Sequence, residues 1–201
     1  MDVDIQTQLR EMVDGLKLSP AELDTRELLP VFLPASFFDG GKWPGPHTRL
    51  RTGSIGLAWA IRLPGNNLRY VNHAMQAMWE AKGVDWKTLA MNNLSRYTEN
   101  LPGPRTLRRV DGEVFAVAFL YDDGLGPSRL LFRGTLSQMF PQGYRVAIPE
   151  RSCGFAFASD LSREEQSQVE GVIHHCYHHG TRPFAADILA ADDLLPVEEI
   201  N

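Results

Sequence analysis

Apolar residues near the start of the chain recur at steps of three and four, which is the period of an α-helix. They form one stripe over residues 4–16. A second, short helix is expected to begin at Ser19 and Pro20, because serine caps helix N-termini and proline is tolerated in the first turn. This helix is expected to end near Pro30. The pattern therefore predicts an N-terminal helical arm.

The next stretch, from Pro30 to Pro46, is rich in glycine, proline and phenylalanine. Such a composition is typical of a loop, and at most one short strand is expected within it. The loop separates the arm from the rest of the chain. We expect residues 1–46 to form the arm and this loop, and residues 47–201 to form a single domain.

Short apolar runs and alternating apolar and polar residues follow, and both patterns predict β-strands. Two hairpins are expected, one around the turn sequence PGNN and one in the last third of the chain. Strands are predicted at residues 55–63, 68–72, 113–121, 144–150 and 153–159.

Helices are predicted between these strands, and three have a recognisable start. Asn72, Asp85 and Ser162 are expected to be N-cap residues, and Glu165 completes a capping box with Ser162. Paired strands with helices between them favour an α+β domain with a mainly antiparallel sheet and helices packed on one face. The predicted helices span about residues 72–82, 85–97, 127–140 and 162–180.

Composition narrows the class of protein. The 201 residues carry a formal net charge of −5, which disfavours a general nucleic-acid binder. No apolar run approaches the ~18 residues of a membrane span, and the first residues lack the pattern of a secretory signal. The two cysteines, Cys153 and Cys176, suggest no disulfide framework. We expect a cytoplasmic protein with neither a nucleic-acid nor a membrane partner.

Four of the six histidines lie together in the sequence VIHHCYHHG. His174 and His178 are one helical turn apart, so this pair could bind a transition metal through two imidazoles, and a second pair has the same spacing. A complete site would need a third ligand, for which His47 and His73 are the candidates. No cofactor other than such a metal is expected.

The same histidines also fit a structural role at the end of a helix. On a helical wheel they lie mostly opposite the apolar stripe that contains Ile173 and Cys176, so they face water. Imidazoles in the last turn before Gly180 interact favourably with the helix dipole. This simpler interpretation also disfavours a joint site of Cys176 with the histidines.

Three further features have both a functional and a structural interpretation. Cys153 would need a nearby histidine to act as a nucleophile, and a buried strand cysteine is the better interpretation. The cluster of Arg105, Arg108 and Arg109 fits phosphate or an acidic partner, but also a solvated loop or strand edge. The sequence DDGLGPSR lacks the glycine spacing and the lysine of a phosphate-binding loop.

Phe37 and Phe38 stand out within the Gly- and Pro-rich loop, because loops are usually exposed. Such a pair either anchors a partner protein or fixes the loop to the core, and the sequence favours neither. These two residues are the candidate partner-binding residues of the chain.

From about residue 55 to residue 185 the chain resembles the YtpQ-like family of bacterial proteins of unknown function. The resemblance rests on the segments LRYVN, DWKTLAMNNL, DGEVFAVAFL, YRVAIPER and VEGVIHHCYHHGTRPF. Where the family often continues with an acidic residue after Ile-Pro-x-Arg, this chain has Ser152 and Cys153. The resemblance implies a soluble bacterial α+β protein and no particular reaction, so it transfers no catalytic residue.

Two functions are compatible with these patterns. The first is a non-enzymatic protein-binding or chaperone-like module, because no catalytic set is assembled and two features could contact a protein partner or a second copy. Those features are the amphipathic N-terminal helix and the loop around Phe37 and Phe38. The second function is a metal-dependent hydrolase built on His174 and His178. The sequence favours the first.

Overall fold

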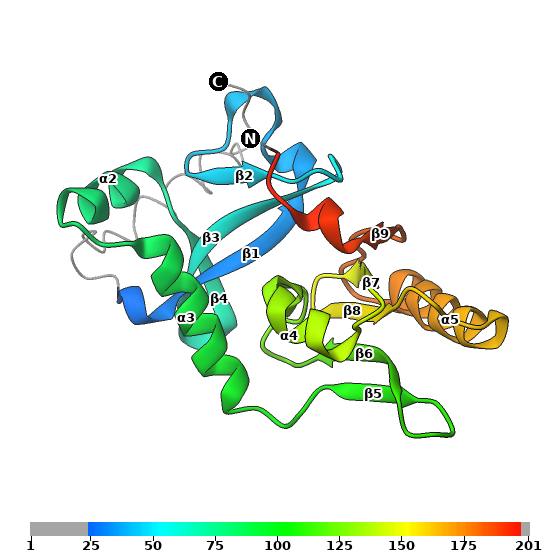
Figure 1. Cartoon of the computed structure of the whole chain (residues 1–201). Coiled ribbons are helices and arrows are strands. Elements are labelled where there is room, and N and C mark those ends of the chain that lie inside the picture. Colours follow the sequence, from blue (N-terminus) through cyan, green and yellow to red (C-terminus); the bar gives the residue numbers. More distant parts are fainter. Residues whose placement is uncertain (1–23, 198–201) are drawn as a thin grey trace.

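The structure is a computed structural model that describes residues 24–197 (Figure 1). The helix predicted over residues 4–16 and the helix start at Ser19 lie outside the described residues. The sequence suggested that the second helix ends near Pro30, and this prediction is wrong. Thr25–Glu27 form a single 3-10 turn, and the backbone is already extended at Leu28.

The first half of the described chain forms a four-stranded antiparallel sheet (blue to cyan in Figure 1). Its central strand is β3 (Ile55–Leu63), which pairs along one edge with β1 (Leu28–Pro34). Strands β2 (His47–Arg49) and β4 (Asn67–Tyr70) pair with successive parts of the other edge. The predicted hairpin of β3 and β4 is confirmed.

Strand β1 occupies seven residues and begins before the stretch where the sequence suggested a loop with at most one short strand. Pro30 and Pro34 hid it, because proline cannot donate a hydrogen bond to a sheet. β1 is an edge strand, however, and Pro30 lies opposite Trp59 at a position where the backbone groups point away from β3. The segment before residue 47 therefore belongs to the same sheet as the segment after it.

The second half forms a five-stranded antiparallel sheet in the order β5-β6-β8-β7-β9. Its strands are β5 (Arg105–Arg108), β6 (Val114–Leu120), β7 (Tyr144–Glu150), β8 (Cys153–Ala158) and β9 (Ile188–Ala190). The predicted hairpin of β7 and β8 is confirmed. Strand β5 contains Arg105 and Arg108 and lies at an edge of this sheet. This agrees with the interpretation of the arginine cluster as part of a strand edge.

Helices connect the strands, and three of them begin at the predicted caps. The side chains of Asn72, Asp85 and Ser162 each accept a hydrogen bond from a backbone N–H in the first turn. The helix predicted over residues 127–140 is divided at Phe132, whose ψ of 56° is not helical. The helices are α2 (His73–Ala81), α3 (Trp86–Glu99), the 3-10 helix η6 (Pro127–Leu131), α4 (Arg133–Met139) and α5 (Arg163–His179).

The two sheets share a hydrophobic core. One cluster contains Phe32 and Ile55 of the first sheet together with Val117 and Val146 of the second. Leu136 of α4 belongs to the same cluster. The described chain is therefore held together by apolar packing between its halves, and not only by the connection between them.

The opposite face of the second sheet is covered as well. Ala147, the neighbour of Val146 on β7, belongs to a different cluster, which contains Phe155 of β8 and Ile173 of α5. Adjacent strand residues point to opposite faces, so α4 and α5 cover opposite faces. The mixed α/β architecture with antiparallel strands is confirmed. The structure differs from the prediction in having two sheets. It also has helices on both faces of the second sheet, which is why every residue of β8 is buried.

The end of the described chain returns to the first sheet. The backbone N–H of Thr52 donates to the carbonyl of Asp193 (3.0 Å), and that of Val197 donates to the carbonyl of Arg49 (3.0 Å). A third backbone hydrogen bond lies between these two. The C-terminal segment (residues 193–197) therefore fastens the second half of the molecule to the connection between β2 and β3.

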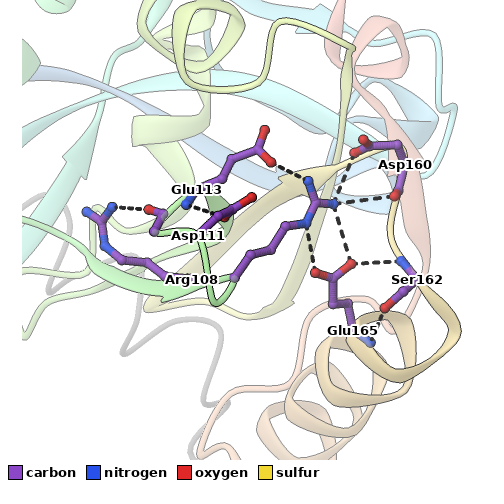
Figure 2. A network of polar contacts seen from close by, with 8 residues as sticks. Arg108, Asp111, Glu113, Asp160, Ser162 and Glu165 are labelled. Carbon is purple, nitrogen blue, oxygen red and sulfur yellow. Dashed lines mark hydrogen bonds and ion pairs between the residues drawn. The ribbon is translucent and has the colours of Figure 1, made fainter.

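Arg109 joins the turn between β5 and β6 to the start of α5 through Glu113, Asp160 and Glu165, which are labelled in Figure 2. Its guanidinium donates hydrogen bonds to Glu165 (Nε–Oε1, 2.8 Å), Glu113 (2.6 Å) and Asp160 (3.4 Å). The hydrogen bond from Arg109 lowers the pKa of the Glu165 carboxyl. Arg108 donates to the carbonyl of Gly112. Arg109 therefore already has three carboxylate partners, and we assign it a structural role.

Replacing Ser162 by alanine is expected to lower the free energy of unfolding by about 1 kcal/mol, because the N-cap hydrogen bond to Glu165 N is lost. Urea unfolding followed by circular dichroism measures the change. Ser167, which is exposed in the same helix, is the matched control, and alanine there should be neutral or slightly stabilising. Equal losses in both variants would contradict the role of the cap.

Candidate functional site

A cleft of about 590 Å³ lies between the two sheets. One wall consists of residues 31–33 of β1 together with Leu68 and Tyr70 of β4. The other wall consists of the loop after β6, the turn between β7 and β8, and the segment after α5. Five separate parts of the chain meet here, and several of them contribute charged side chains. This cleft is the candidate functional site.

The outer edge of β1 faces this cleft. Ser128 lines the cleft, and its hydroxyl donates to the carbonyl of Pro30 at 2.8 Å. The carbonyl of Pro30 points away from β3, because it accepts Ser128 while its register partner Trp59 accepts the Val71 N–H on the other side of β3; every second residue of β1 shares that outward direction. Leu28, Phe32 and Pro34 therefore also present their backbone groups on the outer edge.

Phe32 is the one residue in the middle of this edge that offers both a donor and an acceptor. Its side chain is packed in the shared core, so only its backbone is relevant here. Within residues 24–197, the outward N–H and C=O of Phe32 have no hydrogen-bond partner. An unpaired edge of this kind can hydrogen-bond to another extended chain.

Arg129 shapes the wall formed by the loop after β6. Its side chain is fully buried and makes two hydrogen bonds with the Asp123 carboxylate, at 3.1 Å and 2.5 Å. Its Nε donates to the Thr98 hydroxyl at 3.0 Å, and its Cζ lies 4.5 Å from the centroid of the Tyr121 ring. Asp123 also accepts from the backbone N–H of Leu125. Within the segment DDGLGPSR, the Asp123 carboxylate therefore accepts the Leu125 N–H, which is then not available to bind an anion.

Glu150 is a buried carboxylate in the lining of the cleft. It accepts hydrogen bonds from the backbone N–H of Ser152 (2.7 Å), from the Ser152 hydroxyl, and from the backbone N–H of Arg182 (3.2 Å). Gly180 allows this contact, because a Cβ there would lie 2.4 Å from Glu150 Cγ. Glu150 thus joins the β7–β8 turn to the segment after α5. No sequence motif singles out Glu150, although an acidic residue that ends the apolar strand YRVAIPE is a usable signal.

Cys153 lies opposite Glu150 in the β7–β8 pairing, and its thiol is buried. Burial, with smaller contributions from the nearby Cys176 and Glu150, raises the pKa of the Cys153 thiol to about 12. Burial also raises the pKa of the Cys176 thiol, which is only half buried. The thiolate is the reactive form of cysteine, so neither residue is a nucleophile near neutral pH. The interpretation of Cys153 as a buried strand cysteine is confirmed.

Stability is expected to fall as the pH rises from about 9 to about 12. The ordinary thiol pKa is 9.0 and that of folded Cys153 is about 12, so the unfolded chain loses its proton first. The stabilisation is complete below pH 9 and disappears as the pH passes through the folded pKa. Urea unfolding of the wild type and of Cys153→Ala at pH 8, 9 and 10 isolates the effect from other titrating groups. A constant difference between the two proteins would contradict it.

The four clustered histidines are exposed on α5, as the helical wheel indicated. The rings of His174 and His178 have centroids 4.1 Å apart. Of the candidate third ligands, His73 begins α2, which lies at the opposite end of the molecule from α5 in Figure 1, and His47 stacks on Phe38. The described part of the chain contains no group of three or more His, Cys, Asp or Glu residues that could hold a metal ion. The metal-site prediction therefore rests on one pair of imidazoles.

The aromatic pair in the first loop is divided between core and surface. Phe38 is buried, with its ring stacked on His47 (centroids 4.6 Å apart) and edge-on to Trp43 (5.1 Å). Phe37 is 45% exposed and lies 5.6 Å below the guanidinium of Arg151, a residue of the cleft rim. Phe38 therefore fixes the loop to the core, and only Phe37 is accessible to a partner.

No protein-family model, no curated protein and no solved structure matches the chain, so the resemblance to the YtpQ-like family stays a prediction. Among residues 24–197, no helix has the length and apolar character needed to cross a membrane. The functional argument therefore rests on the cleft itself.

Proposed function

We propose that the protein is a non-enzymatic binding module that holds an extended segment of a partner protein in the cleft between its two sheets. The observation that carries the proposal is the outward N–H and C=O of Phe32 on the edge of β1, at the wall of the cleft. An extended peptide that adds to a sheet edge gains main-chain hydrogen bonds of this kind, and its side chains supply specificity.

The prolines of β1 limit this pairing to a short segment. Pro30 and Pro34 flank Phe32 on the outer edge and have no N–H to donate. The carbonyl of Pro30 already accepts the Ser128 hydroxyl. A partner can therefore form two main-chain hydrogen bonds at Phe32 and little pairing beyond it, which favours a short extended segment over a long added strand.

Apolar side chains beside the cleft suit such a ligand. Leu68 lines the cleft and is 38% exposed, and exposed Phe37 lies next to the rim. Neighbouring residues of an extended peptide point to opposite sides, so one side chain can contact Leu68 while the next points away. This role retains Phe37 as a partner-binding residue and assigns Phe38 to the scaffold.

The test is selection from a displayed library of random linear heptapeptides on the full chain. We expect enriched sequences whose binding, measured by fluorescence anisotropy, weakens at least about tenfold in Leu68→Trp, which fills the cleft. Bound peptide should also slow hydrogen exchange at the Phe32 amide, because that N–H enters a hydrogen bond.

Leu107→Trp is the matched control, since Leu107 is equally exposed but lies on β5, away from the cleft. Its affinity for the selected peptides should stay within about twofold of the wild type. The proposal fails if no sequence is enriched over a selection without protein. It also fails if Leu68→Trp binds as well as the control.

A further inference from the structure

The rim of the cleft carries two arginines, Arg151 in the β7–β8 turn and Arg182 after α5. Among the described residues, neither guanidinium has a carboxylate partner within salt-bridge distance, in contrast to Arg109, Arg129 and Arg133. The side-chain contact of Arg151 is the exposed ring of Phe37. Two cationic groups with open hydrogen-bond donors therefore border the same cleft.

The backbone holds these two arginines side by side. The N–H of Arg151 donates to the carbonyl of Arg182 at 3.1 Å. The buried carboxylate of Glu150 accepts the N–H of Arg182 and the N–H of Ser152, so the residues on both sides of the contact are fixed. Because these two backbones are held together, only the side chains of Arg151 and Arg182 remain to be ordered when both bind one ligand, which lowers the entropy cost.

The carboxylates of the cleft are already engaged. Asp123 is paired with Arg129, and each Glu150 oxygen accepts a hydrogen bond from a neighbouring loop. Asp122 also has a partner. The guanidinium groups at the rim are therefore left to attract a negative group from outside the chain. The exposed Thr181, which also lines the cleft, adds a hydroxyl donor beside Arg182.

We propose that Arg151 and Arg182 form a carboxylate-binding subsite that selects partner segments with an acidic side chain. This inference deepens the proposed function, because the acidic residue would belong to the extended segment paired with β1. The planar fork of a guanidinium matches the two oxygens of a carboxylate, and such charge-assisted pairs are short and strong.

The first experiment tests the subsite without any peptide. Glutarate is titrated into the ¹⁵N-labelled full chain while the arginine Nε–Hε resonances are followed. We expect saturable shifts for Arg151 and Arg182, and none for Arg145, an exposed arginine on β7 outside the cleft. The subsite is rejected if all three respond alike, or if inorganic phosphate shifts the pair and glutarate does not.

The second experiment uses the selected heptapeptides. They should contain glutamate or aspartate, and glutamine in its place should weaken binding at least about tenfold. Arg151→Gln and Arg182→Gln should each remove this preference, whereas Arg145→Gln should keep it. Peptides that bind in the cleft without an acidic preference would reject the subsite alone. Glutarate shifts without any enriched peptide would instead reject the proposed function and leave the subsite intact.

Discussion

Replacing Arg129 by methionine is expected to lower the free energy of unfolding by about 3–5 kcal/mol. The guanidinium is fully buried, and its loss leaves the Asp123 carboxylate, whose side chain is only 15% exposed, without its cation. The hydrogen bond to Thr98 on α3 is lost as well. Urea unfolding followed by circular dichroism measures the change.

Arg133 provides the matched control for this prediction. It forms a short ion pair with Asp192, but both side chains are partly exposed, at 38% and 69%. Solvent screens such pairs, so Arg133→Met is expected to cost less than about 1 kcal/mol. The double variant Arg129→Met with Asp123→Asn should recover part of the loss, because no unpaired charge remains. Similar losses for Arg129→Met and Arg133→Met would argue against the buried pair.

Replacing Gly126 by alanine is expected to lower the free energy of unfolding by about 2–3 kcal/mol. A Cβ at this position would lie 2.2 Å from the carbonyl oxygen of Ser152 and 2.4 Å from that of Phe119. Both are backbone atoms and cannot move aside as a flexible side chain can. The start of η6 would therefore be pushed away from β6 and β8. Thermal and urea unfolding of the full chain measure the effect.

Gly134→Ala is the comparison for Gly126→Ala. Gly134 lies inside α4, and a Cβ there would meet nothing within 4 Å. Alanine is a better helix former than glycine by about 0.5–1 kcal/mol, so this variant should be more stable than the wild type. Opposite signs for the two substitutions separate close backbone packing from backbone entropy. If Gly126→Ala were also stabilising, the close approach at η6 would be wrong.

Features that depend on near neighbours in the chain were predictable from the sequence. The caps at Asn72, Asp85 and Ser162 are confirmed, because a cap needs only a side-chain oxygen and an N–H two or three residues later. The two hairpins are confirmed for a similar reason, since each joins strands that are adjacent in sequence.

Features that depend on distant segments were not predictable. The Gly-, Pro- and Phe-rich composition from Pro30 to Pro46 predicted a loop with at most one short strand, and only the edge position of β1 in the folded sheet makes Pro30 and Pro34 acceptable in a seven-residue strand. Arg129 looked like an ordinary charged residue, and its burial depends on Thr98 from a helix 31 residues earlier. No pattern in one segment carries that information.

The cleft was missed for the same physical reason. Glu150 and the backbone of Arg182 are 32 residues apart, and their contact exists only once α5 has packed on the second sheet. The histidine cluster and the Phe37–Phe38 pair attracted attention because each is contiguous in sequence. The cleft is instead lined by five separate segments, and only one of them, DDGLGPSR, suggested a binding role by its sequence.

The return of residues 193–197 to the first sheet has a consequence for biosynthesis. Segments of the first sheet leave the ribosome early, but the backbone partners of Arg49 and Thr52 lie at the very end of the described chain. At ordinary rates of translation, the ~140 residues between Thr52 and Asp193 take about 7–28 s to make. We therefore expect a nascent chain that lacks its last residues to remain sensitive to protease around residues 49–52. Protection there should appear only after residues 193–197 have emerged from the ribosome.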